Sequence, residues 1–531
     1  MFTSLLQALS GIVLAMCVGS PLSDFYVDVQ NGSDTTGNGS SALPWKTISF
    51  AVTQLGSGTN RLLVRPGLYD STSGESFPIV LRAGMTLEST DGAADTIVSG
   101  DPSSDVLRIE GADADCVIVG LTIENGDSGV AVLLDRAFAV IRNNTISGNA
   151  LAGIKTGLVN QGTHTIAIQK NTITLNGTGL LGAGGGVTVG IESADNQFSS
   201  NSSDALSLSG VVFLVSRRDT MQNNGGRGLS QIIPPSANGF LQTSISNATI
   251  SGNQAGGIYA LADQFCFYVQ YFGWICDDPE NSIQAFACTI YGNGGDGVKR
   301  AGTSGSGSRF LAESIAWGNA GVDNVNFKDH ICNIGTGSRT HAESFSLPPL
   351  LVNPQAGDLR IRKDSPCIDR SPGLAFTDFE GEVGGVDGNS DGIAAGDVGA
   401  DEFHPFVAPG TRAVIGQPFW FFSEAPPADD GQLVFVMIST ADGQKSGGIP
   451  VPGSQGQTVD LAPDWLFQLG LTLQPALTGT LQNGFAQTAT VTLPNSTLFL
   501  GPVFYAGATI DLVAGQFKYV TPTHQFSIAT Q

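Results

Sequence analysis

The chain has 531 residues, enough for more than one domain, and only 13% of them are charged. Its 70 glycines favour short strands joined by tight turns over long helices. The formal net charge is −23 and no basic cluster interrupts it, which excludes a nucleic-acid-binding footprint. Neutral glycans and cations are the expected partners, because an acidic polysaccharide would need a bridging divalent cation.

An apolar segment from Leu5 to Val18 has the length of a signal-peptide core and is too short for a confident membrane span. We therefore expect residues 1–23 to be a signal peptide and the protein to be secreted or exposed at the surface of a bacterium after Sec export. Lipid attachment at Cys17 is disfavoured, because Met16 stands where a lipoprotein box has a small residue. No later segment is expected to span a membrane.

Six cysteines follow the predicted signal peptide, an even number that is compatible with disulfides in an exported protein. Cys266 and Cys276 flank a short step in the sequence and are predicted to pair, which would stabilise the loop by roughly 2–3 kcal/mol. The other four can be paired or can be buried thiols: Cys116, Cys288, Cys332 and Cys367. None of the six shows zinc-type spacing.

One phrase recurs along the middle of the chain, for example NNTISGN at 143–149 and NATISGN at 247–253. Its central apolar residue returns about every 25 residues, without a helical pattern, which predicts a β-solenoid in which three strands complete a coil. Stacked coils would bury one another's apolar residues. The residues expected to lie above one another are Ile123, Ile146, Ile173, Phe198, Met221, Ile250 and Ile290.

The phrase ends on an asparagine, which we expect at a corner of each coil. Asn tolerates the left-handed conformation and can hydrogen-bond to its neighbour in the next coil. The alternative is that these residues form a ligand-binding row: Asn149, Asn176, Asn201, Asn253, Asn293 and Asn319.

The step from Ile250 to Ile290 is longer than the others, which predicts an inserted loop. The surplus falls on DQFCFYVQYFGWICDDPE at 263–280, which concentrates aromatic and acidic residues. Aromatic faces can stack on sugar rings and carboxylates can bond their hydroxyls, so this insertion is a candidate glycan-binding site. Its candidate ligand-binding residues are Tyr268, Tyr271, Trp274, Asp277 and Asp278. The alternative is a flap whose aromatic residues pack on the solenoid wall.

An open solenoid end must be covered, and residues 43–55 suit that task. Pro44 can begin a helix in which Trp45, Ile48, Val52 and Leu55 share one face. This helix would belong to a cap formed with the first coils.

The segment FYVDVQNGSDTTGNGSSALPWKTISFAV at 25–52, followed by LLVRPGLYD at 62–70, resembles the opening of bacterial right-handed parallel β-helix proteins of the pectin-lyase-like superfamily. That opening belongs to an N-terminal domain of unknown function. PPLLVNPQAGDLRIRKDSPCIDRS at 348–371, with DVGADEF at 397–403, resembles the closing module of choice-of-anchor Q proteins. The superfamily includes lyases, hydrolases and adhesins, so the resemblance implies the fold but no particular activity.

The expected fold class is therefore all-β: a right-handed parallel β-helix of about ten coils with an N-terminal cap, followed by a β-sandwich. After His404 the phrase no longer recurs, and apolar strand candidates are separated by Gly and Pro, which predicts the sandwich. The expected domains are a signal peptide, the cap with the first coils, the β-helix repeats, the acidic closing segment and the sandwich, at 1–23, 24–96, 97–345, 346–404 and 405–531.

Residues 386–397, VDGNSDGIAAGD, alternate oxygen ligands as the first half of an EF-hand-type loop does. We expect Ca²⁺ here as the one candidate cofactor. The candidate ligands are Asp387, Asn389, Asp391 and Asp397, the last of which is out of position for an EF-hand. The alternative is a solvated acidic turn.

Catalytic motifs are weak. Lys299 and Arg300 follow a corner and are the candidates for the base and the carboxylate-neutralising group of a polysaccharide lyase, with Arg217–Arg218 and His164 as further options. A hydrolase would use carboxylates on adjacent coils, for which the candidates are Asp195, Asp204 and Asp219. We expect a non-catalytic carbohydrate-interacting or structural protein, with a polysaccharide lyase or glycoside hydrolase acting in the lateral groove as the alternative.

Overall fold

The computed structural model divides the chain into two units, Met1–Phe345 and Ser346–Gln531. Up to residue 425 it describes 23–425 except 56–59, 83, 113–115, 136–137, 157–163, 234–239, 263–264, 270–272, 278–279, 303–307, 373–376, 382–383, 386–387, 390–392, 394, 404–405 and 410–416. Beyond that it describes 431–440, 449–450, 458–459, 461, 468, 476–482, 485–492, 501–511, 516–520 and 524–528.

The first unit opens with strand β1 (Ser23–Val27), which pairs in parallel with β2 (Asn60–Val64). Between them lies helix α2 (Ile48–Gln54), which begins after Thr47 rather than at Pro44 because the Thr47 side chain caps it. The Glu75 carboxylate accepts the next two N–H groups at 2.6 and 2.8 Å. The apolar face predicted for this helix is buried, with Ile48 fully inaccessible.

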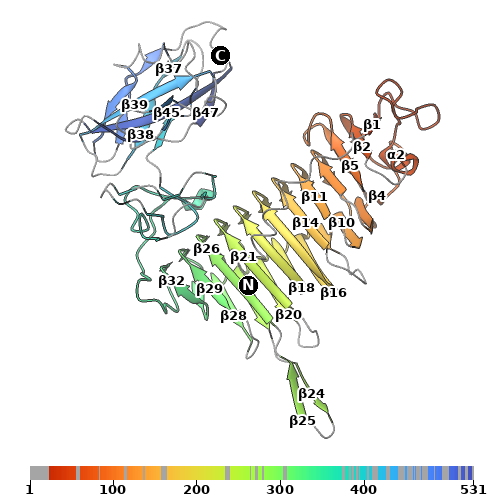
Figure 1. Ribbon diagram of the computed structural model, residues 1–531, viewed down its shortest axis with the longest axis horizontal. Helices are drawn as coiled ribbons and strands as arrows, with labels where there is room; N and C mark the ends of the chain where they lie inside the picture. The colour runs from red at the N-terminus through yellow and green to blue at the C-terminus, as the bar shows by residue number, and fades with distance from the viewer. Residues whose placement is uncertain are drawn as a thin grey trace. The chain divides into compact units, whose positions relative to one another are not determined.

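The rest of this unit is a parallel β-solenoid (Figure 1). An 11-stranded parallel sheet contains the centres of the repeated phrases. Its strands are β3 (Gly67–Tyr69), β6 (Thr96–Ser99), β9 (Thr122–Glu124), β12 (Thr145–Ser147), β15 (Thr172–Thr174), β17 (Gln197–Ser199), β19 (Thr220–Gln222), β22 (Thr249–Ser251), β27 (Thr289–Tyr291), β30 (Ile315–Trp317) and β33 (Asn333–Ile334). Ile146 is in register with Ile173, and Ile173 with Phe198, as predicted. All three are fully buried, so the coils shield one another's aliphatic side chains.

The other walls form one 20-stranded sheet together with β1 and β2. Its remaining strands are β4 (Ile79–Arg82), β5 (Met85–Ser89), β7 (Leu107–Ala112), β8 (Cys116–Val119), β10 (Ser128–Asp135), β11 (Phe138–Arg142), β13 (Ala152–Thr156), β14 (His164–Gln169), β16 (Thr178–Ala194), β18 (Leu206–Arg217), β20 (Arg227–Ile233), β21 (Phe240–Ser246), β23 (Gly256–Ala262), β26 (Glu280–Phe286), β28 (Val298–Ala301), β29 (Arg309–Ala312), β31 (Asn324–Val325) and β32 (Lys328–His330). One coil is thus β12, β13 and β14, followed by β15.

The phrase-ending asparagines form a buried amide ladder along one corner. Each donates its backbone N–H and its Nδ2 to the Oδ1 of the next, as Asn149 does to Asn176 at 3.1 and 2.9 Å. The ladder also contains Asn224, which the phrase alignment missed, and it ends where Asn319 donates to Asp323. Its members are at most 8% exposed, which argues against a ligand-binding row.

The left-handed residue at this corner is not the ladder asparagine but the residue before it. Gly148, Leu175 and Ser200 have φ of 66°, 59° and 55°, and each directly precedes a ladder asparagine. The turn therefore leaves the Asn side chain pointing along the stack, where its amide is satisfied by its neighbours. The expectation that Asn itself adopts the left-handed conformation was wrong.

The second unit begins with β34 (Leu351–Asn353), the 3₁₀ turn η1 (Pro354–Ala356) and β35 (Asp358–Ile361). Small antiparallel sheets follow, as the β-sandwich prediction requires, and Phe419, Phe421, Val436 and Tyr505 lie in their buried core. Their strands are β36 (Phe406–Pro409), β37 (Pro418–Phe419), β38 (Phe421–Glu424), β39 (Leu433–Ser439), β40 (Ile449–Pro450), β41 (Thr458–Val459), β42 (Thr478–Thr480), β43 (Phe485–Gln487), β44 (Val491–Thr492), β45 (Gly501–Asp511), β46 (Gln516–Val520) and β47 (His524–Ile528).

Candidate functional site

The insertion predicted between Ile250 and Ile290 is an antiparallel β-hairpin of β24 (Phe265–Val269) and β25 (Gly273–Asp277). It leaves the solenoid after β23 and returns at β26, and Figure 1 shows it extending away from the coils. In its backbone register Tyr268 faces Trp274 across the two strands. The side chains of Tyr268, Trp274 and Asp277, and the whole of Tyr271 and Asp278, lie outside the described residues.

The same register sets Cys266 opposite Cys276, the pairing that the sequence predicts. The structure does not describe their sulfur atoms, so the disulfide stays a prediction. Four other thiols are buried in the described part of the chain and form no disulfide there: Cys116, Cys288, Cys332 and Cys367. Burial raises the pKa of the Cys288 and Cys332 thiols to about 12, so both remain protonated and unreactive.

Strand β28 places Lys299 and Arg300 on the coil that follows β23. Lys299 is in register with Tyr259, whose ring lies 3.9 Å from the Arg227 guanidinium. The Lys299 ammonium pairs with the carboxylate of Asp296 at 2.7 Å. Lys299 is thus a neutralised surface cation, and this geometry does not prepare it to remove a proton.

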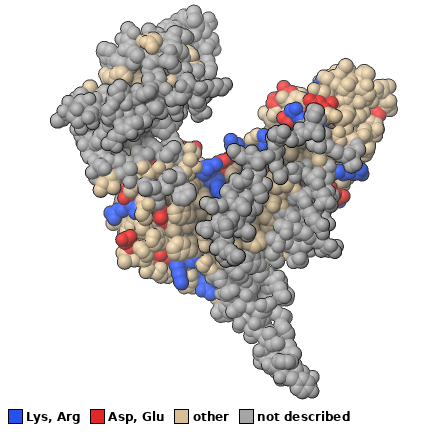
Figure 2. Space-filling view, viewed as in Figure 1, with Lys and Arg blue, Asp and Glu red and all other residues tan. Residues whose placement is uncertain are grey.

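Arg300 instead lines an open cleft of about 410 Å³. A second cation, Lys328, lines the same cleft, and Figure 2 shows basic side chains on this edge of the solenoid, near β28 in the matching view of Figure 1. The remaining lining residues are Gly302, Asn326, Phe327, Ser338 and Thr340. Sequence analysis found Arg300 but not Lys328, because register rather than spacing brings the two together.

The candidate hydrolase carboxylates have structural partners. Asp195 pairs with Arg218 at 2.7 Å, and Asp204 accepts the backbone N–H of Arg227 at 2.7 Å. Asp219 is fully buried and accepts both donors of Asn196. The structure therefore assigns these three carboxylates to holding coils together. Of the further lyase options, Arg218 is in this ion pair and the His164 side chain lies outside the described residues.

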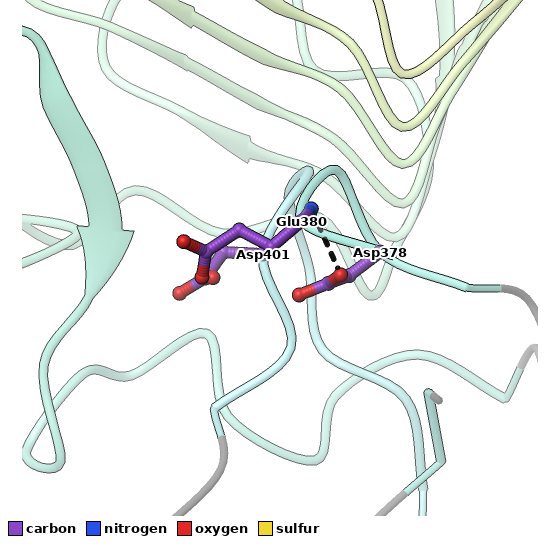
Figure 3. A group of neighbouring side chains, drawn as sticks. All are labelled: Asp378, Glu380 and Asp401. Carbon is purple, nitrogen blue, oxygen red and sulfur yellow. Dashed lines mark hydrogen bonds between the residues drawn. The ribbon is translucent and has the colours of Figure 1, made fainter. Parts of the chain in front are cut away.

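In the second unit three carboxylates, those of Asp378, Glu380 and Asp401, offer oxygens within 4.8 Å of one another (Figure 3). Asp401 is buried and accepts the backbone N–H of Ile361, while Asp378 accepts that of Glu380 at 3.0 Å. Burial raises the pKa of Asp401 well above its usual range, and the Asp378 and Glu380 charges raise it further. This all-oxygen, anionic donor set fits a hard cation such as Ca²⁺.

The residues predicted to hold Ca²⁺ are not the ones brought together there. Asp397 is buried and accepts the backbone N–H groups of Asp369 and Phe403 at 2.7 and 2.6 Å. Burial and the neighbouring Glu402 raise the pKa of Asp397 well above its usual range. Asn389 is exposed, and Asp387 and Asp391 lie outside the described residues.

Residues 30–219 match the family described as "Protein of unknown function (DUF1565)". No curated protein matches the chain. None of the helices in the described part has the length and hydropathy of a membrane span. The DUF1565 match covers the cap and the first coils, and together with the stacked parallel strands it makes this chain a parallel β-helix protein.

Proposed function

We propose that the protein is exported, is not catalytic, and binds an extracellular polysaccharide or cell-surface glycan at the corner where the β24–β25 hairpin is inserted. The observation that carries the proposal is the hairpin itself. Among the described coils it alone adds strands of its own to a corner, and its segment concentrates the aromatic residues that the corners otherwise lack. Loops on a rigid scaffold are where binding residues collect, and aromatic rings give binding area at low entropic cost.

We place the chain in the pectin-lyase-like superfamily and treat residues 346–404 as a choice-of-anchor Q-like closing module, on the sequence resemblances described above. The antiparallel sheets after residue 405 then serve attachment or sorting. Ca²⁺ bound by Asp378, Glu380 and Asp401 would offset the mutual repulsion of their carboxylates in that module.

A polysaccharide lyase or glycoside hydrolase is the competing function. Arg300 and Lys299 lie on β28, which pairs with β23, the solenoid strand that precedes the hairpin, where a lyase would need its cations. The Lys299–Asp296 ion pair and the structural roles of Asp195, Asp204 and Asp219 favour binding without turnover.

Incubation with pectate, alginate, sulfated and neutral polysaccharides, with and without Ca²⁺, tests the proposal. We expect retention of at least one polysaccharide and no products. Retention should be lost in the Tyr271→Ala, Trp274→Ala double variant and kept in Tyr291→Ala, which removes a half-buried aromatic ring from the 11-stranded sheet. Unsaturated products absorbing in the ultraviolet, or new reducing ends, would show instead that the protein is an enzyme.

A further inference from the structure

The cleft beside β28 contains two cations without ionic partners in a protein with a net charge of −23. Among the described residues, no ion pair or hydrogen bond holds the side chains of Arg300 and Lys328. Many other cations of the solenoid are paired, as Lys155 is with Asp105 at 2.6 Å. Like charges placed close together repel unless an anion is bound, so this cleft is the place where an anionic ligand would be stabilised.

The register of the coils builds the cleft. Lys299 is paired with Val325, so Arg300 follows over the corner that contains Asn326. Phe310 is paired with Lys328, which brings the second cation to the same corner. Strands β23, β28 and β31 are stacked in this order, and the hairpin is inserted after β23. The hairpin and the cleft therefore lie at the same corner of the solenoid, two coils apart.

Neighbouring acids do not neutralise the cleft. Asp329 directly follows Lys328 but is buried, and its carboxylate accepts both the hydroxyl of Thr340 and the backbone N–H of His341. No carboxylate is among the described residues that line the cleft. A third cation, Arg309, lies close to Arg300 and is only 5% exposed. Burial, and then the charge of Arg300, lowers the pKa of Arg309 to about 10.

We propose that this cleft binds sulfate half-ester groups of a sulfated polysaccharide, an inference that rests on the proposed glycan-binding function and names its ligand class. The cleft offers one guanidinium, one ammonium, the hydroxyl of Ser338 and the Asn326 amide. A sulfate ester presents three acceptor oxygens, no donor and a permanent charge, so it matches these groups more fully than a two-oxygen carboxylate does. The volume of about 410 Å³ is within the range of small-ligand sites.

Binding of the full-length protein to dextran sulfate, unmodified dextran and polygalacturonate, at low and physiological ionic strength, tests the inference. We expect dextran sulfate to bind more tightly than the other two. The Arg300→Ala, Lys328→Ala double variant should bind it at least tenfold more weakly, because two charge-assisted bonds to the ligand are lost. Arg82→Ala, Arg142→Ala is the matched control, because it removes two exposed cations from elsewhere in the solenoid.

The possible results separate the cleft, the sulfate group and the hairpin as the source of binding. Equal loss in the cleft and control variants would overturn the inference, because binding would then follow net charge alone. Polygalacturonate binding as tightly as dextran sulfate would overturn the choice of sulfate. If binding depends on Trp274 but not on Arg300 or Lys328, the proposed glycan binding is supported and the cleft is not its ligand site. Loss in the cleft variant with an unchanged melting temperature would support the inference, and Arg300→Lys should then restore part of the binding.

Discussion

The Oδ1 of Asp219 accepts both the backbone N–H and the side-chain Nδ2 of Asn196, at 2.8 and 3.0 Å. It thereby takes the position that an asparagine occupies in the preceding coils, where Asn144 donates to Asn171 and Asn171 to Asn196. Ser216 donates to its other oxygen at 2.6 Å. Asp323 ends the other ladder, which runs from Asn149 to Asn319, in the same way. A carboxylate thus closes each of these two amide ladders.

Asp219 should give the protein a measurable pH dependence. Burial raises its pKa from 3.8 to about 6, against the opposing effect of its hydrogen bonds. The protonated carboxyl therefore stabilises the fold fully below about pH 4, and this contribution is lost as the pH rises to about 6. Asn carries no charge at any pH, so Asp219→Asn should keep the stability that the parent loses as Asp219 ionises. We expect it to raise the free energy of unfolding by about 3 kcal/mol at neutral pH.

The measurement is urea unfolding of the parent protein and of Asp219→Asn across the range from about pH 4 to pH 7. The difference between the two should grow with pH and level off above about pH 6. A difference that is constant across the range would mean that Asp219 is ionised throughout.

Interrupting the amide ladder should lower the free energy of unfolding. Asn201→Ala removes the acceptor of two bonds from Asn176, at 3.0 and 3.1 Å, and the donor to Ile173. Each buried donor left unsatisfied costs about 1–3 kcal/mol, so we expect a loss of roughly 3 kcal/mol or more in unfolding free energy. Gln197→Ala, an exposed change in the same coil, should shift it by less than about 0.5 kcal/mol. Equal effects of the two variants would show that the ladder does not contribute to stability.

Sequence reasoning succeeded where one residue type is repeated with the coil period. The stack of Ile146, Ile173 and Phe198 and the corner asparagines were predictable, because a solenoid imposes the same environment on each coil. The second ladder was missed although its signal was present: Asn144 and Asn171 stand two residues before the apolar centre of each phrase.

Asp219 stands at the same offset, but the sequence interpretation placed it among candidate hydrolase carboxylates. The sequence alone does not distinguish a buried Asp in a ladder from an exposed Asp at a corner. Lys328 and the Asp378–Glu380–Asp401 group were not predictable, because register and loop closure bring their members together. Neither leaves a periodic pattern in the sequence.

The calcium prediction can be tested on two sets of carboxylates. We expect Ca²⁺ to stabilise the protein, by about 2.7 kcal/mol at a hundredfold excess over Kd, and Asp378→Asn with Asp401→Asn to abolish the effect. The shift should be larger near pH 8 than near pH 5, because Asp401, whose pKa is raised, must lose its proton to coordinate the ion. If Asp387→Asn with Asp391→Asn abolishes the stabilisation by Ca²⁺ instead, the ion binds in the 386–397 loop. The absence of any Ca²⁺ shift in the parent protein would remove the calcium site altogether.

The hairpin cysteines give a chemical prediction. Alkylation of the unfolded, unreduced mature protein should modify the four buried thiols of the described chain, Cys116, Cys288, Cys332 and Cys367. It should leave a cross-linked peptide containing Cys266 and Cys276, whose alkylation requires prior reduction. Mass spectrometry that finds both hairpin cysteines alkylated without a reductant would refute the disulfide.

Glycan retention by the hairpin is the most direct test of the functional account. Affinity electrophoresis of the parent protein and of the Tyr271→Ala, Trp274→Ala variant, in gels containing each polysaccharide of the panel, measures it on folded protein. The account predicts that the parent is retarded by at least one polysaccharide and that the variant, with an unchanged melting temperature, migrates as in a gel without glycan. Equal retardation of parent and variant, or no retardation by any polysaccharide, would contradict it.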